Sequence, residues 1–369
     1  MGVFLDVGNL NGRGAQPFVA SRSEPGGFDE LLREWDGERA VIRYEAEDDA
    51  WVFVCLHSTR LGPAGGGTRM RVYPSPAEGL SDAMRLSAAM TRKLAVAGLP
   101  FGGGKAVLAV PEIPHGERRR RLLLRYGELL ESLGGRFWTG PDLNTDERDM
   151  DMLPYALIKS EARGGLGSSA PATAVGILHG IRASVKHRFG SDRLDGLVVL
   201  VQGIGGVGSH LAELLINAGA RVLVSDVDAA RIRELASRLS VRAVAPERAY
   251  AADCDIFAPC AVGGVFDERS ISQLKCRIVA GAANNQLATP EDGRRLRDRQ
   301  ILYAPDYVIN AGGALYGIGL AALDWPREEV DRRLAGIAET LTTIYREADD
   351  EGIPTSEAAD RLAAARLAA

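Results

Sequence analysis

Three side chains in the first half of the chain have the type and the setting for acid–base chemistry: Lys93, Lys105 and Asp142. Lys105 follows the triplet Gly102-Gly103-Gly104 and opens an apolar run that predicts a strand. A second ammonium group beside a buried lysine favours loss of its proton. Lys105 next to Lys93 could therefore serve as a general base near neutral pH. Taken alone, Lys93 would be a solvated surface charge and Asp142 part of a local turn.

A helix predicted over residues 75–97 separates two glycine triplets, Gly65-Gly66-Gly67 and Gly102-Gly103-Gly104. Pro76 suits its first turn, and apolar residues recur along it at helical spacing. Glycine lets other groups approach the backbone closely, at a cost in conformational entropy. A binding site is a good reason for two such triplets. We interpret the stretch as a cleft in which both lysines face a substrate that bears a carboxylate.

Short helices and strands surround this helix. Residues 40–45 and 51–57 alternate apolar and polar side chains on either side of E-D-D, which is typical of a hairpin. Residues 57–69 are expected to form a glycine-rich loop that leads into a short strand. Further helices are predicted over residues 28–35, 117–133 and 145–155, and strands over residues 105–110 and 136–139.

The second half of the chain carries a dinucleotide-binding pattern. An apolar run over residues 197–201 predicts a buried strand, and it leads into G-x-G-x-x-G at Gly203, Gly205 and Gly208, where a helix begins. The glycines permit the tight turn, the approach of a pyrophosphate and the packing of helix on strand. Asp226 ends the next strand, where a carboxylate suits a ribose 2′-hydroxyl and favours NAD over NADP. The alternative is a tight turn without a ligand.

Length and composition indicate a two-domain α/β protein of 369 residues. A formal charge of −5 does not favour nucleic acid or an anionic membrane as a partner. The four cysteines form no disulfide or metal-ligand motif, which indicates a reducing compartment, the cytoplasm. We predict an extension (1–27), an α/β substrate-binding domain (28–165, with about 346–369) and a doubly wound, Rossmann-type NAD-binding domain (166–345). The C-terminal helices are expected to pack back across the junction.

Seven short blocks follow one another from about Ala40 to the C-terminal helices. They are G-P-A-G-G-G-T-R-M, M-T-R-K, L-P-F-G-G-G-K, W-T-G-P-D-L-N-T, G-S-S-A-P-A-T-A-V-G, A-G-A-A-N-N-Q-L and N-A-G-G. Together they resemble the glutamate/leucine/phenylalanine/valine dehydrogenase family, and within it phenylalanine dehydrogenases most. The resemblance implies NAD-dependent oxidative deamination of a hydrophobic L-amino acid to its 2-oxo acid and ammonia. It also implies a homo-oligomer joined through the first domain.

The same resemblance implies roles for individual residues. Lys93 would bind the substrate α-carboxylate, Lys105 would activate the water that attacks the iminium, and Asp142 would transfer protons. The other positions implied to contact substrate are Gly66, Gly67, Met90, Gly140, Pro141, Asn284, Ala314 and Gly317. The positions implied to contact the cofactor, beside the glycine motif and Asp226, are Arg69, Ser169, Thr173, Gly206, Val207, Ala261, Asn284 and Asn310. No residue is assigned to a metal.

The substrate side chain is expected to be aromatic. In the family, glycine at the position of Gly140 goes with aromatic substrates and alanine with aliphatic ones. Valines stand in the aliphatic-specific members where this chain has Ala314 and Gly317. Small residues leave room for a ring, whose burial is worth about 2–3 kcal/mol. We therefore expect phenylalanine or another aromatic amino acid. The alternatives are a leucine or valine dehydrogenase, and a regulator that binds NAD or an amino acid without catalysis.

Overall fold

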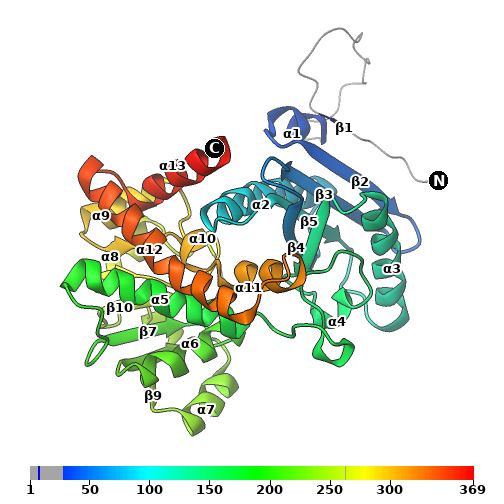
Figure 1. Ribbon diagram of the computed structural model, residues 1–369. Coiled ribbons are helices and arrows are strands. Elements are labelled where there is room, and N and C mark those ends of the chain that lie inside the picture. Colours follow the sequence, from blue (N-terminus) through cyan, green and yellow to red (C-terminus); the bar gives the residue numbers. More distant parts are fainter. Residues whose placement is uncertain (1–6, 9–27, 262) are drawn as a thin grey trace. The chain divides into compact units, whose positions relative to one another are not determined.

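The computed structural model describes residues 7–8, 28–261 and 263–369. Contacts divide the chain into two compact units, one ending at Ser168 and the other running from Ser169 to Ala369 (Figure 1). Apart from Val7 and Gly8, the predicted extension over residues 1–27 lies outside the described residues. Among the residues that the structure describes, no helix is long and apolar enough to cross a membrane.

The first unit is built on a mixed sheet. Its strands are β1 Val7–Gly8, β2 Arg39–Glu45, β3 Ala50–Ser58, β4 Ala64–Arg71, β5 Gly102–Ala109 and β6 Phe137–Pro141. They lie in the order β1-β2-β3-β5-β4-β6. The predicted hairpin of β2 and β3 is confirmed, β3 pairs antiparallel with β5, and β4 runs parallel to β5 and β6. The helices are α1 Phe28–Glu34, α2 Pro76–Val96, α3 Gly116–Ser132 and α4 Glu147–Met150, with a 3-10 turn over Glu161–Arg163.

The two faces of this sheet are covered by different helices. On β5, Ala106 and Leu108 pack in the apolar cluster that includes the buried side of α3. Val107 and Ala109 pack in a second cluster, with apolar residues of α1 and α2. Successive side chains of a strand point to opposite faces. Lys105 therefore belongs to the face that α2 covers.

The two glycine triplets lie within strands, so the predicted glycine-rich loop is wrong where β4 begins. Gly65 of β4 pairs with Gly103 of β5, and α2 connects these parallel strands. A Cβ on Gly103 would lie 2.1 Å from the backbone nitrogen of Thr91 in α2, and one on Gly66 would lie 1.8 Å from the carbonyl oxygen of Gly104. Close packing of the two strands and α2 thus requires glycine at these positions.

The helix predicted over residues 145–155 is also wrong beyond Met150, where α4 ends. Pro154 disfavours helical backbone in the residue before it, and Tyr155 has a φ of 52°. The Asp151 carboxylate accepts hydrogen bonds of 2.9 and 2.5 Å from the N–H and hydroxyl of Ser160. Between these two residues the chain returns to β6, where the N–H of Leu157 donates a 2.7 Å hydrogen bond to the carbonyl of Thr139.

The second unit contains an all-parallel sheet. Its strands are β7 Val198–Gln202, β8 Arg221–Ser225, β9 Val241–Ala243, β10 Ile256–Pro259, β11 Ile278–Val279 and β12 Leu302–Tyr303. They lie in the order β12-β11-β10-β7-β8-β9. The chain moves outward from β7 through β8 and β9, and then continues on the other side of β7 from β10 to β12. This order confirms the predicted doubly wound fold, in which ligands bind beside the strand where the direction reverses.

Helices α5 and α12 pack together in this unit. Its helices are α5 Ala170–Phe189, α6 Gly206–Asn217, α7 Ala229–Arg238, α8 Glu268–Gln273, α9 Glu291–Asp298, α10 Asp306–Ile309, α11 Gly312–Ala321, α12 Arg327–Glu351 and α13 Thr355–Ala368, with a 3-10 turn over Pro246–Arg248. Ser184 of α5 shares a 2.7 Å hydrogen bond with Tyr345 of α12, and Thr355 donates one of 2.7 Å to the carbonyl of Tyr303.

These contacts change the predicted domain limits. Residues 346–369, expected with the first domain, are grouped with the second unit, and the boundary expected at 165/166 falls between Ser168 and Ser169. The amphipathic pattern of a helix shows that one face is buried but does not identify the surface that buries it. Sequence periodicity alone therefore cannot predict the unit with which these helices pack.

Candidate active site

Three residues, one each on β5, β4 and β6, lie side by side on the face of the sheet that α2 covers. The register that pairs Gly65 with Gly103 sets Gly67 of β4 beside Lys105 of β5, and Gly67 pairs in turn with Gly140 of β6. A Cβ on Gly67 would lie 3.2 Å from the Nζ of Lys105, whereas a Cβ on Gly140 would meet no atom within 4 Å. Lys105 is thus the one residue of these three that has a side chain, and the position of Gly140 borders open space.

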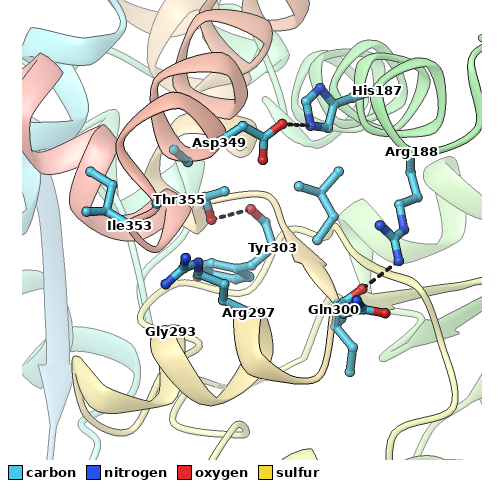
Figure 2. A pocket seen from close by; sticks show the side chains of 13 residues that line it. His187, Arg188, Gly293, Arg297, Gln300, Tyr303, Asp349, Ile353 and Thr355 are labelled. Carbon is cyan, nitrogen blue, oxygen red and sulfur yellow. Dashed lines mark hydrogen bonds and ion pairs between the residues drawn. The ribbon is translucent and has the colours of Figure 1, made fainter.

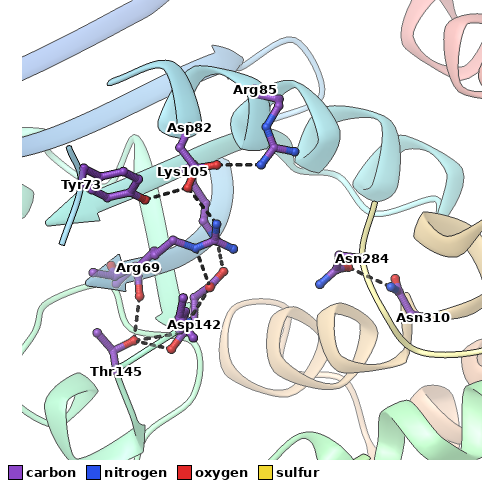
Figure 3. A network of polar contacts seen from close by, with 12 residues as sticks. Arg69, Tyr73, Asp82, Arg85, Lys105, Asp142, Thr145, Asn284 and Asn310 are labelled. Carbon is purple, nitrogen blue, oxygen red and sulfur yellow. Dashed lines mark hydrogen bonds and ion pairs between the residues drawn. The ribbon is translucent and has the colours of Figure 1, made fainter. Parts of the chain in front are cut away.

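Lys105 is buried, with 4% of its surface exposed, and its Nζ forms an ion pair with one carboxylate oxygen of Asp142. The other oxygen accepts a 3.1 Å hydrogen bond from the Nε of Arg69, so one carboxylate holds two cations (Figure 3). Burial acts to raise the pKa of Asp142, but the charges of Lys105 and Arg69 and the hydrogen bonds from Lys105 and the Leu143 N–H hold it well below its usual range. Asp142 is therefore ionised in this arrangement.

Backbone contacts fix Asp142 in the loop after β6. Its N–H donates a 2.9 Å hydrogen bond to the hydroxyl of Thr145, which donates one of 2.7 Å to the carbonyl of Thr68. The N–H of Leu143 donates a 2.5 Å hydrogen bond to the Asp142 carboxylate. The local turn considered as an alternative for Asp142 is therefore present, and the carboxylate reaches both cations from within it.

Replacing Asp142 by asparagine should destabilise the protein at neutral pH and destabilise it less in acid. Because the pKa of Asp142 is lowered in the folded state, its ionised form stabilises the fold above the unfolded pKa of about 4. This contribution is lost as the pH falls through the lower folded pKa. Loss of one partner of a buried ion pair costs about 3 kcal/mol.

Thermal unfolding of wild type and Asp142→Asn between about pH 8 and about pH 3 tests this expectation. The difference in Tm should be constant above about pH 5 and narrow below about pH 4. A difference that widens in acid would contradict the lowered pKa of Asp142.

The predicted substrate residues of the first half all belong to the first unit. Lys93 lies in the last turn of α2, and Met90 lies on the same helix one turn earlier; both side chains are half-buried. Pro141 is the last residue of β6. The role of Lys93 as a carboxylate ligand stays a prediction. The ion-pair partner of Lys105 is Asp142.

The glycine motif of the second unit has the geometry that each glycine requires. Gly203 has a φ of 90°, and its N–H donates a 2.7 Å hydrogen bond to the carbonyl of Ser225. A Cβ on Gly208 would lie 1.9 Å from the carbonyl oxygen of Gly203. A Cβ on Gly205 would meet a single neighbouring atom, at 3.9 Å, at the end of the Arg231 side chain. The turn and the helix–strand packing thus require glycine, and Gly205 leaves the start of α6 open to a ligand.

Asp226 follows β8 and is held by the backbone on both sides. One carboxylate oxygen accepts a 2.8 Å hydrogen bond from the N–H of Ile204, and the other accepts one of 2.8 Å from the N–H of Asp228. The first of these contacts ties the carboxylate to the glycine-rich turn. An acceptor fixed in this position can bind a sugar hydroxyl next to a pyrophosphate at the start of α6.

Apart from Arg69, which lies in the first unit, the remaining predicted cofactor residues lie within the second unit. Gly206 and Val207 open α6, and Ala261 lies against Gly203, where a Cβ would be 2.6 Å from that of Ala261. The other predicted cofactor residues of this unit, with the predicted substrate residues Ala314 and Gly317, form two groups. One, beside the N-terminus of α11, contains Ser169, Thr173, Ala314 and Gly317, and the other contains Asn284 and Asn310, joined by a 2.8 Å hydrogen bond.

Asp82 and Tyr73 are part of the polar network of the first unit, and sequence reasoning missed both. Asp82 of α2 accepts hydrogen bonds of 2.8 Å from Arg69 and 2.7 Å from the Tyr73 hydroxyl. Arg69 therefore bridges Asp82 and Asp142; the cofactor contact that the resemblance implies for it stays a prediction. The sequence indicated only that Asp82 is an acidic residue in the predicted helix that follows the first glycine triplet. Nothing in the neighbouring residues connected it with Arg69.

A cavity of about 370 Å³ lies within the second unit, and none of the predicted site residues lines it (Figure 2). It is lined by the ends of α5, α9 and α12, and His187 pairs there with Asp349 at 3.1 Å. Arg188 and Arg297 lie in the last turns of α5 and α9, where cations stabilise the partial negative charge of a helix C-terminus. This explains the basic residues of the cavity without a ligand.

Comparison with known proteins agrees with this arrangement. Residues 46–157 match the dimerisation domain of the Glu/Leu/Phe/Val dehydrogenases, and residues 228–369 match the Glutamate/Leucine/Phenylalanine/Valine dehydrogenase domain. A leucine dehydrogenase of Thermoactinomyces intermedius is 38% identical over 92% of this chain and 93% of its own length. A phenylalanine dehydrogenase of Bacillus thermotolerans is 39% identical over 90% and 88%.

The crystal structure of L-tryptophan dehydrogenase from Nostoc punctiforme superposes with a TM-score of 0.78 at 37% identity, covering 92% of this chain and 99% of that one. Relatives named for leucine, phenylalanine and tryptophan are thus about equally similar, so overall identity does not separate these substrates. Two matching domain models and this coverage establish the family. The chain belongs to the glutamate/leucine/phenylalanine/valine dehydrogenase family of amino-acid oxidoreductases.

Proposed function

We propose that the protein catalyses the reversible, NAD-dependent oxidative deamination of an aromatic L-amino acid, first of all L-phenylalanine, to its 2-oxo acid and ammonia. The observation that carries the proposal is the buried Lys105 ammonium held by the Asp142 carboxylate, beside Gly67 and Gly140. An isolated buried charge is too costly to persist without a partner. An amine and an acid in contact, next to open space, are suited to proton transfer to and from a bound substrate.

In the proposed mechanism, Lys93 binds the substrate α-carboxylate and Asp142 receives the substrate ammonium. When bound, NAD would supply the acceptor for the hydride that leaves Cα. Asp142 accepts one proton of the substrate ammonium, and the substrate becomes an iminium. The substrate ammonium competes with Lys105 for the Asp142 carboxylate, so Lys105 can release its own proton to solvent. The neutral Lys105 amine then turns to a water molecule and takes a proton from it. The resulting hydroxide adds to the iminium carbon. Asp142 returns its proton to the amine of the carbinolamine and takes the hydroxyl proton as ammonia leaves, which gives the 2-oxo acid.

Asp142 changes its strength as a base during this sequence. While Lys105 and Arg69 both contact it, its lowered pKa makes it a weak proton acceptor. It becomes a stronger one when Lys105 turns away to the water, because one of the two positive charges is then more distant. The proposal therefore assigns it first the binding of the ammonium, then the acceptance of one ammonium proton, and later the return of that proton to the departing amine.

The second unit fits NAD through its own residues. The open backbone at Gly205, at the start of α6, suits the pyrophosphate, and the Asp226 carboxylate suits a ribose diol and repels a 2′-phosphate. Ser169, Thr173, Ala261 and Asn310 are the further cofactor residues of the proposal, and Asn284 is placed beside the substrate amine. A retired enzyme that binds ligands without turnover is less well supported, because Lys105 and Asp142 are both retained and paired.

The aromatic preference rests on Gly140, with Ala314 and Gly317 as further lining positions. Gly140 is buried, yet a Cβ there would meet no atom within 4 Å. Its missing side chain is therefore not required by packing and leaves space for a substrate. A leucine dehydrogenase is the second candidate, since relatives of that name are equally similar. Rates of NAD reduction with L-phenylalanine, L-tryptophan and L-leucine decide between them, and a leucine preference in kcat/KM would refute the aromatic assignment.

Gly140→Ala should change substrate choice without unfolding the protein. The added methyl enters open space, so we expect Tm to be unchanged, while kcat/KM for L-phenylalanine falls about 10-fold relative to L-leucine because one methyl in a pocket is worth about 1–3 kcal/mol. Gly67→Ala is the matched control. Its Cβ would lie 3.0 Å from that of Asp142 and 3.2 Å from the Nζ of Lys105, so it should lower kcat for both substrates alike. An unchanged phenylalanine/leucine ratio in Gly140→Ala would remove this position from the pocket.

We also propose a homo-oligomer assembled through the first unit. The support is the match of residues 46–157 to a domain described as a dimerisation domain. Sedimentation of the whole chain tests the proposal, and a monomer at micromolar concentration would contradict it.

A further inference from the structure

We propose that Asp82 is a positioning residue, which fixes Arg69 so that its guanidinium holds the Asp142 carboxylate in place against Lys105. The kinetic consequences rest on the deamination proposed above. Asp82 itself touches neither Lys105 nor Asp142 through any of its described hydrogen bonds. It acts through a chain of contacts that begins on α2, passes through β4 and ends in the loop after β6 (Figure 3).

The first link in this chain is the anchoring of Asp82 itself. Its side chain is 12% exposed. One oxygen accepts hydrogen bonds from the Nη1 of Arg69 at 2.8 Å and from the Tyr73 hydroxyl at 2.7 Å, and the other accepts one of 2.7 Å from Arg85. Three donors on one half-buried carboxylate satisfy it from two directions, so it is a fixed acceptor and not a mobile surface charge.

The second link is the rigid geometry of Arg69. It uses Nη1 for Asp82 and Nε for Asp142, at 2.8 and 3.1 Å. The donors of a guanidinium lie in one plane at fixed angles, so the contact with Asp82 determines the direction in which Nε points. Without Asp82, the Arg69 guanidinium could rotate away from Asp142. The Asp142 carboxylate would then lose the donor that holds one of its oxygens while the other pairs with Lys105.

Replacing Asp82 by asparagine should lower kcat about 10- to 100-fold, because small misplacements of reacting groups cost factors of this size. The acid limb of the pH–rate profile should move to higher pH, since Asp142 loses part of the charge that favours its ionised form. The matched control is Glu78→Gln, the same change of carboxylate to amide one turn earlier on α2, at an exposed position. This control should retain both the rate and the profile of the wild type.

A double-mutant cycle separates positioning from general destabilisation. If Asp82 acts through Asp142, Asp82→Asn should have almost no further effect on kcat in the Asp142→Asn background. A loss of the same factor in both backgrounds would overturn the proposal, as would an unchanged kcat and pH profile in Asp82→Asn.

A readout that needs no turnover keeps this test independent of the proposed reaction. The difference in Tm between proteins with aspartate and with asparagine at position 142 should narrow at a higher pH in the Asp82→Asn background than in the wild-type background. The same pH dependence in both backgrounds would overturn the positioning role even in a fully active enzyme. If no amino acid is oxidised by the wild type, the deamination fails, and the Tm measurement still decides the role of Asp82.

Discussion

Lys105→Met is expected to reduce kcat by about 10³-fold, because a general base typically contributes 10²- to 10⁴-fold. The substitution removes the amine while retaining a side chain of similar length. Arg69 remains hydrogen-bonded to Asp142, so the carboxylate is not left buried without a cation. The loss should therefore appear in the chemical step, with the affinity for NAD unchanged within about twofold. Steady-state kinetics and a direct titration with NAD measure the two quantities separately.

Two variants distinguish the loss of a base from the loss of a charge. Lys105→Arg retains a cation for Asp142, but a guanidinium does not release its proton, so this variant should be as inactive as Lys105→Met. In Lys105→Ala, added primary amines should restore part of the rate. Lys93→Met, by contrast, should raise KM for the amino acid more than it lowers kcat, as expected for a binding group. Full activity of Lys105→Arg would eliminate Lys105 as the base.

The sequence predicted the second half of the site better than the first, for a physical reason. The roles of Gly203, Gly205 and Gly208 depend on neighbours a few residues away, in one strand, one turn and one helix. Local spacing therefore contains the information, and the predicted turn and packing are found. The doubly wound order of the sheet likewise follows from the alternation of strands and helices along the chain.

The network around Asp142 depends on pairings that local spacing does not contain. Arg69 and Asp142 meet because β4 pairs with β6, and Asp82 joins them because α2 lies on the same face of the sheet. The triplets misled the prediction in the same way. Gly65 and Gly103 are far apart in sequence and become neighbours in parallel strands. Local sequence therefore suggested a glycine-rich loop over residues 57–69, although close packing of the strands is what requires glycine there. The predicted residues Lys105 and Asp142 were nevertheless brought together, since the resemblance carried that long-range information.

Asp226→Ser should reverse the choice of cofactor. Loss of a hydrogen bond to a charged group costs about 1.5–3 kcal/mol, so kcat/KM with NAD should fall about 10- to 100-fold. The two N–H groups of Ile204 and Asp228, which now donate to the Asp226 carboxylate, would lose that acceptor. Arg231 lies near the same turn, 3.9 Å from the position of a Cβ on Gly205. Two free amide donors and a guanidinium suit a 2′-phosphate, so activity with NADP should rise about 10-fold.

Asp228→Asn is the matched control for this change of charge. Asp228 lies two residues from Asp226, and its side chain caps α7 by accepting a 2.9 Å hydrogen bond from the N–H of Ala230; asparagine caps helices equally well. Both variants remove one negative charge from the same loop, but Asp226 alone is joined to the glycine-rich turn. If Asp226 binds the ribose, the NAD/NADP ratio should change in Asp226→Ser and stay near the wild-type value in Asp228→Asn. Equal changes in the two variants would mean that the general field of the loop, and not a contact of Asp226, determines the preference for NAD.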